Sequence, residues 1–168
     1  MEFGRRFPEC VAGIVLAATF PQAETTVGVD SRNRMADRVM AEGMALVGCE
    51  ILPKLIGTAS MKRLPQLAAN VYRMICETDP AAAAAALRGR ALRQDYRASL
   101  RDFTFPCLIL IGAQDAYTTL AEAEAMRDAI KASRLEIFPE IGHLPNLEDP
   151  ERFNRLLQDF LDLVFDEA

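Results

Sequence analysis

The sequence is poor in the residues that build metal sites and nucleic-acid sites. It contains one histidine, His143, and four cysteines that are spread over the chain without a Cys-x-x-Cys pair. This set excludes a zinc site of the usual cysteine and histidine composition. The net charge of −5 and the pI near 5.0, with no basic stripe, argue against nucleic-acid binding. We therefore expect neither a metal nor a nucleic acid among the ligands of this protein.

Long hydrophobic runs are also missing. The first ten residues, MEFGRRFPEC, contain no apolar core of the kind found in a secretory signal. No apolar run approaches the length of a membrane-spanning helix. Two cysteines, Cys10 and Cys107, adjoin apolar runs, which favours buried, reduced thiols. From these absences we expect a soluble, cytoplasmic protein that makes no contact with a membrane.

The residues that are present indicate a globular domain of the α/β class. Hydrophobic residues make up 51% and charged residues 26% of 168 residues, which suits one domain with a core. Short apolar runs predict buried strands at 11–19, 105–112 and 134–138. Amphipathic patterns between and after these runs predict helices, several of which begin at a capping residue such as Asp79, Thr119 or Asp149. Strands separated by helices imply a parallel sheet, so we expect three parallel strands with flanking helices.

The pattern of apolar and polar residues divides the chain into three parts. Residues 1–30 read as the end of a helix followed by the first strand of a core. Residues 31–101 are helical and predict an insertion in the form of a cap or lid. Residues 102–168 return to alternating strands and helices and complete the core. Because a helix end runs directly into a strand of the buried type, we expect the beginning of the fold to lie outside this sequence.

Two residues that carry chemistry follow two of the predicted strands. Asp115 lies just past the strand that ends at Gly112, and His143 lies just past the strand that ends near Phe138. In open parallel sheets, catalytic groups gather at the carboxyl ends of the strands. A carboxylate beside a histidine fixes the tautomer of the imidazole and stabilises the imidazolium that forms when it acts as a general base. Each residue alone could be structural, but the pair in this order predicts a catalytic site.

The stretches RRFPECVAGIVLAAT, FPCLILIGAQDAYTTLAEAEAM and RLEIFPEIGHLPNLEDPERFNRLLQDFL resemble the second half of an α/β-hydrolase of the small esterase and lactonase kind. The Gly112-x-x-Asp115 and Gly142-His143 motifs match the acid and base positions of that family, and the helical part matches its cap. The resemblance implies hydrolysis of a small-molecule carboxylic ester or lactone without a cofactor. Tyr117 and Leu144, which neighbour the pair, are candidates for contact with the substrate.

The sequence departs from the family pattern at the nucleophile. The family places a serine in a Gly-x-Ser-x-Gly turn between a strand and a helix, before both partners in the chain. No such motif occurs in this sequence. Neither its serines nor Cys49 stands in the required strand-to-helix context. The resemblance therefore implies a C-terminal segment that carries the acid and the base but not the nucleophile.

Three hypotheses about function stay open from the sequence. The first is a segment of an acyl hydrolase that is inactive as an isolated chain. The second is a non-catalytic binding or assembly module that forms homo-oligomers, since the first strand would present an exposed apolar edge. The third is a hydrolase in which His143 activates a water molecule directly.

Overall fold

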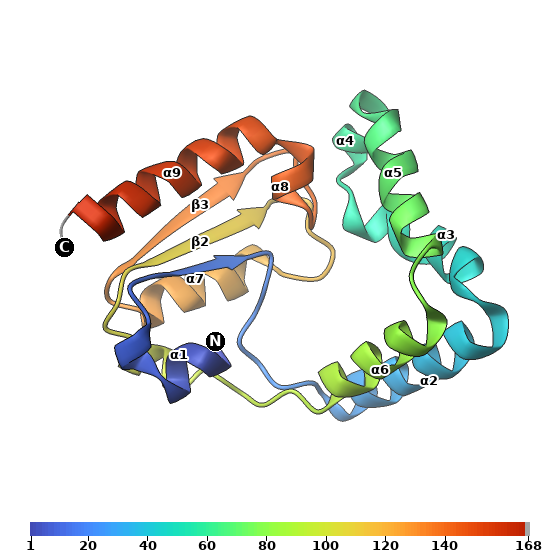
Figure 1. The fold of residues 1–168 in the computed structure, drawn as a ribbon, viewed down its shortest axis with the longest axis horizontal. Coiled ribbons are helices and arrows are strands. Elements are labelled where there is room, and N and C mark those ends of the chain that lie inside the picture. The colour runs from blue at the N-terminus through green and yellow to red at the C-terminus, as the bar shows by residue number, and fades with distance from the viewer. Residues whose placement is uncertain (167–168) are drawn as a thin grey trace.

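A computed structural model describes residues 1–166 of the chain. They form a small parallel sheet with helices on both faces and a group of further helices that stands to one side (Figure 1). The strands are β1 (Ile14–Ala17), β2 (Cys107–Gly112) and β3 (Ser133–Phe138). The helices are α1 (Glu2–Arg6), η1 (Pro8–Cys10), α2 (Thr26–Glu42), α3 (Met44–Leu55), α4 (Thr58–Arg63), α5 (Pro65–Cys76), α6 (Pro80–Ala91), η2 (Ser99–Asp102), α7 (Leu120–Ala129), α8 (Pro145–Glu148) and α9 (Pro150–Asp166). The predicted α/β class with three parallel strands is confirmed.

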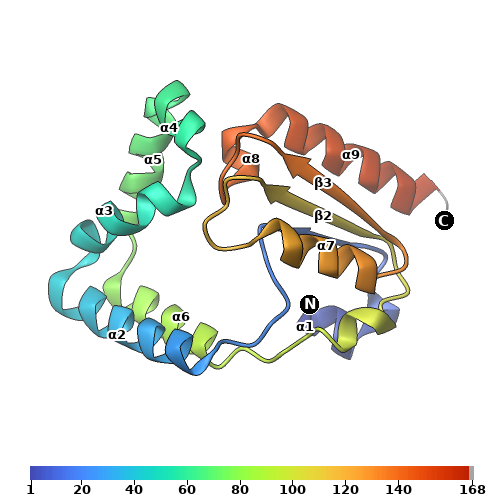
Figure 2. The same cartoon turned by 180° about the vertical axis from the view of Figure 1, so that it is seen from behind.

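The strands lie in the order β1-β2-β3, and both pairings are parallel. The central strand β2 reads CLILIG and is buried along its whole length. Its alternate residues face opposite sides of the sheet. Ile109 and Ile111 pack with Met126 of α7, while Leu108 and Leu110 pack with Leu156 and Phe160 of α9. The continuous apolar run is thus explained by helices that cover both faces, as Figures 1 and 2 show from opposite sides.

The helices α2 to α6 form a separate group beyond the carboxyl ends of the strands (Figure 2). Within this group α2 packs against α6 and α3 packs against α5. A small apolar cluster of its own includes Ala36, Val39, Val47 and Ala84. The alanine-rich run of α6 begins at Asp79, whose side chain accepts a hydrogen bond from the Ala81 N–H. None of the helices within residues 1–166 is both long and apolar enough to cross a membrane.

Several local expectations are corrected by the structure. The first strand is shorter than the apolar run 11–19, because Pro8–Cys10 forms a 3-10 turn and pairing with β2 begins only at Ile14. Cys10 is exposed rather than buried, since it ends that turn. Cys107, in contrast, is buried in β2 as expected, and burial raises the pKa of its thiol to about 12. The capping box of α7 is confirmed, with Thr119 and Glu122 bonding each other's backbone N–H.

Candidate active site

Asp115 and His143 meet at the carboxyl ends of β2 and β3. His143 Nδ1 lies 2.8 Å from Asp115 Oδ2, as a charge-assisted hydrogen bond requires. The Asp115 side chain is fully buried, whereas the His143 side chain keeps 26% of its surface exposed. When Nδ1–H donates to the carboxylate, the Nε2 lone pair is left free to accept a proton. The structure therefore brings together the two residues that the sequence singled out.

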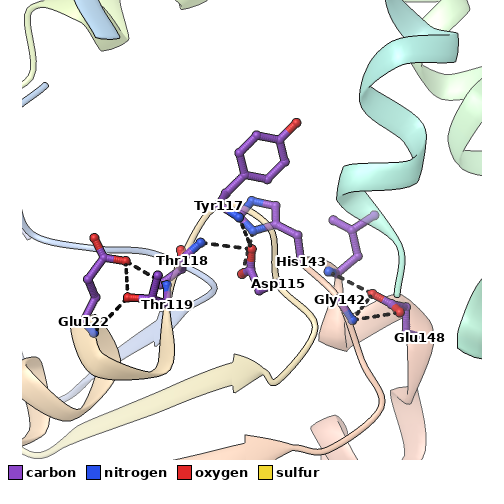
Figure 3. A network of polar contacts seen from close by, with 9 residues as sticks. Asp115, Tyr117, Thr118, Thr119, Glu122, Gly142, His143 and Glu148 are labelled. Atoms are coloured by element: carbon purple, nitrogen blue, oxygen red, sulfur yellow. Dashed lines mark hydrogen bonds and ion pairs between the residues drawn. The ribbon is translucent and has the colours of Figure 1, made fainter. Parts of the chain in front are cut away.

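The backbone around Asp115 fixes the direction of its carboxylate. Its Oδ1 atom accepts hydrogen bonds from the N–H groups of Tyr117, at 2.7 Å, and Thr118, at 3.1 Å. Figure 3 shows the carboxylate next to these two N–H groups and to the imidazole. Because both oxygens have partners, the side chain cannot turn without breaking a hydrogen bond. The carboxylate of Asp115 is thus held in one orientation, with one oxygen directed at His143.

The two loops that carry the pair touch through their backbones. The N–H of Gln114 donates to the Ile141 carbonyl at 2.9 Å, and the N–H of Ala113 donates to the Phe138 carbonyl at 2.8 Å. A side chain on Gly112 would place its Cβ 2.0 Å from the Gly142 carbonyl oxygen. Glycine is therefore required at position 112, because the His143 loop occupies the space of a side chain. This contact sets the distance between the Asp115 loop and the His143 loop.

The two residues predicted to contact substrate take different positions. Tyr117 is 39% exposed and lies with its ring edge against His143, at 5.0 Å between ring centroids. Its ring projects from the pair toward the helical group, as Figure 3 shows. Partial burial, and then the negative charge of Asp115, raise the pKa of the phenol above its usual value, so the hydroxyl stays neutral. Leu144 is half-buried, and its backbone begins α8. Of the two, Tyr117 is the one whose ring lies against that of His143.

Residues 1–166 contain neither a nucleophile hydrogen-bonded to the His143 ring nor a metal site. Within residues 1–166, Asp115 is the only hydrogen-bond partner of the His143 ring. The same part of the chain contains no group of three or more histidine, cysteine, aspartate or glutamate residues placed to hold a metal ion. Chemically, the pair can accept a proton at His143 Nε2. The Asp115 carboxylate then stabilises the positive charge on the imidazole.

Sequence reasoning missed Glu148, which is the other buried carboxylate near the pair. It is only 2% exposed, and its oxygens accept hydrogen bonds from the backbone around His143. In the sequence it stands in the mainly polar stretch NLEDPER, where a glutamate is expected on the solvent-exposed face of a helix. A usable signal was Pro145, since a proline that starts a short helical turn folds the following residues back toward the loop.

Comparisons with known proteins find esterases and lactonases among the relatives. The chain is 31% identical to a thermophilic esterase from Thermogutta terrifontis, with a TM-score of 0.93 over 96% of this chain and 60% of that one. It is 27% identical to 3-oxoadipate enol-lactonase 1 of Acinetobacter baylyi, over 79% of this chain and 49% of that protein. The enol-lactonase of Burkholderia xenovorans shares its fold, with a TM-score of 0.83, 22% identity, and coverage of 95% of this chain and 59% of that one. No protein-family model matches the chain. The chain spans about half the length of the curated relatives it matches.

Proposed function

We propose that this chain, which belongs to the α/β-hydrolase superfamily, is the part of an acyl hydrolase that supplies the general base and its orienting acid. The observation that carries the proposal is the 2.8 Å contact between His143 Nδ1 and Asp115 Oδ2 at neighbouring strand ends. His143 takes the proton of an attacking hydroxyl, and Asp115 holds the tautomer and stabilises the imidazolium. The substrate is a small carboxylic ester or lactone, in line with the names of the relatives.

The remaining parts of the site follow from the same proposal. The nucleophile is a serine outside this sequence, and a helical cap formed by residues 31–101 covers the acyl group. Tyr117 borders the acyl group, because its exposed ring lies against the imidazole. Leu144 remains a proposed substrate contact by its position next to His143. A reducing compartment such as the cytoplasm suits the chain, since all four cysteines, each within the described range, are free thiols.

The proposal is tested by offering the purified chain a short p-nitrophenyl ester and a fluorophosphonate probe. We expect no labelling by the probe and no turnover above the buffer rate, because the chain has no Gly-x-Ser-x-Gly serine. Turnover that disappears in a His143→Ala variant, without labelling, would favour water activated directly by His143. Labelling of a serine of this chain would contradict the proposal, because the nucleophile would then lie within the sequence.

A second candidate function, assembly through the sheet edge, is favoured by the surroundings of β1. This strand pairs with β2 on one side, and no strand of residues 1–166 pairs with its other side. Next to it lies a groove of about 390 Å³ between the N-terminal segment and α9. Phe3 and Phe165 beside this groove are 58% and 63% exposed. An unpaired edge beside exposed apolar side chains favours pairing with another chain.

We expect the chain to self-associate through the outer edge of β1 at micromolar concentration. An Ala17→Lys substitution on the exposed end of β1 should shift the protein toward monomer, because a charged side chain on an edge strand discourages pairing. Ala82→Lys on the exposed face of α6 is the matched control and should leave the association unchanged. Sedimentation velocity measures both variants. A wild-type protein that sediments as a monodisperse monomer would exclude assembly through the sheet edge.

A further inference from the structure

Glu148 connects two parts of the chain that are far apart in sequence. Its Oε2 atom accepts a hydrogen bond from the Gly57 N–H, at 2.9 Å, in the link between α3 and α4. Both oxygens accept from the Gly142 N–H, at 3.0 Å, and Oε1 accepts from the Leu144 N–H, at 3.2 Å. Gly142 and Leu144 are the two neighbours of His143. One buried carboxylate therefore holds the backbone on both sides of the imidazole and the backbone of the helical group.

The short helix α8 explains how Glu148 reaches this position. After Leu144 the chain turns through Pro145, and the N–H groups of Leu147 and Glu148 both donate to the Leu144 carbonyl at 2.9 Å. This turn brings the carboxylate back under the loop that it follows, as Figure 3 shows. Among the salt bridges of residues 1–166, none involves Glu148. Its hydrogen-bond partners are backbone N–H groups alone, which would be buried without a partner if the carboxylate were removed.

Close backbone packing makes this junction tight. A Cβ on Gly142 would lie 2.4 Å from the Gly57 nitrogen, and a Cβ on Gly57 would lie 2.9 Å from the Glu140 carbonyl oxygen. The His143 N–H donates to the Leu55 carbonyl at 2.9 Å, and the Thr58 N–H donates to Gln114 Oε1 at 2.8 Å. The α3–α4 link thus contacts the His143 loop and the Asp115 loop at once. A shift of this link would disturb both loops, because Gly57 and Gly142 pack backbone against backbone and Thr58 is hydrogen-bonded to Gln114.

We infer that Glu148 is a positioning residue that couples the helical segment around Gly57 to the imidazole of His143. This inference rests on the proposed function for its catalytic meaning, but the coupling itself is a property of the backbone. When the link and the His143 loop share the carboxylate, His143 Nδ1 stays in line with Asp115. When the link moves away, Gly142 and Leu144 lose their common acceptor, and the imidazole loses its alignment. The helical group would in this way control the orientation of the imidazole through the backbone on both sides of His143.

The single histidine allows a direct test by nuclear magnetic resonance of the full chain. We expect Glu148→Gln, which keeps the shape but turns one acceptor oxygen into an amide donor, to speed amide exchange at Gly57 and Gly142 at least tenfold. The nitrogen shifts of the His143 ring should move away from the Nδ1–H tautomer in the same variant. Glu140→Gln makes the same change of charge at an exposed position of the same loop, and it should alter neither readout. Faster exchange with unchanged His143 shifts would make Glu148 only structural and overturn the inference, as would wild-type values for both readouts.

A second measurement, on the wild-type protein, tests the inference even if the Glu148→Gln variant does not fold. In native-state exchange with increasing urea, the Gly57 and Gly142 amides should open as one unit, because they share one acceptor. Exchange of Gly57 at least tenfold faster than that of Gly142 would overturn the coupling. Asp115→Asn separates this inference from the proposed function, since it should change the His143 tautomer and leave exchange at Gly57 as it is. Labelling of a serine of this chain by the fluorophosphonate probe would then count against the proposed function alone.

Discussion

Replacing His143 by alanine in a complete enzyme is expected to lower kcat/KM for ester hydrolysis by about 10⁶-fold. The complete enzyme is a chimaera in which this chain replaces the matching part of the Thermogutta terrifontis esterase, to which it is 31% identical. The chain has no second histidine that could take the proton in place of His143. Steady-state kinetics with p-nitrophenyl acetate measure the effect, and the unchanged chimaera provides the reference rate.

Two further variants of the chimaera separate the roles around His143. Asp115→Asn should lower kcat/KM by about 10³–10⁴-fold, because the amide favours the wrong imidazole tautomer. Tyr117→Phe should lower it by less than about tenfold, since the ring that lies against His143 is kept and only a neutral hydroxyl is lost. If the His143→Ala chimaera kept more than a tenth of the reference activity, His143 would not be the general base.

The second large effect is expected at Gly112, where a methyl group has no space. A Cβ at this position would lie 2.0 Å from the Gly142 carbonyl oxygen and 2.2 Å from the Ile141 carbonyl oxygen. Both obstacles are backbone atoms, so no side-chain rotation can relieve the clash. We expect Gly112→Ala to lower the free energy of unfolding by about 3 kcal/mol or more, measured by urea denaturation. It should also break the contact between His143 and Asp115, because the loops are forced apart.

Gly89 provides the matched control for this substitution. It lies inside α6, and a Cβ built on it meets no atom within 4 Å. Gly89→Ala should therefore raise the free energy of unfolding by about 0.5–1 kcal/mol, through helix propensity alone. The two substitutions add the same atom and have opposite expected signs. Equal effects at both positions would contradict the close packing of the two loops.

The parts of the fold that could be predicted from the sequence are those encoded by local patterns. The apolar run of β2 and the capping box at Thr119 and Glu122 each specify an element within a few residues. The contact between Asp115 and His143 could be predicted because strand ends gather at one edge of a parallel sheet. These predictions needed only the period of the pattern and the direction of the strands.

The remaining features depend on contacts between distant residues and have no local signature. Glu148 looks like a surface residue of a helix until Gly57 is placed beside it. The strand β1 ends where its pairing with β2 ends, which the apolar run around it does not reveal. Cys10 is exposed because a short turn carries it out of the sheet. In each case tertiary packing overrides what the local residues suggest.

The spacing of the strands along the chain has a consequence for the order of folding. The strands β2 and β3 are joined by residues 113–132, whereas β1 and β2 are joined by residues 18–106. Closing the shorter loop costs less chain entropy, and local pairings form faster. We therefore expect the βαβ unit of β2, α7 and β3 to act as the nucleus, with the Asp115 loop and the His143 loop already attached to it. The first strand would dock last, so the acid and the base could find each other before the rest of the sheet is complete.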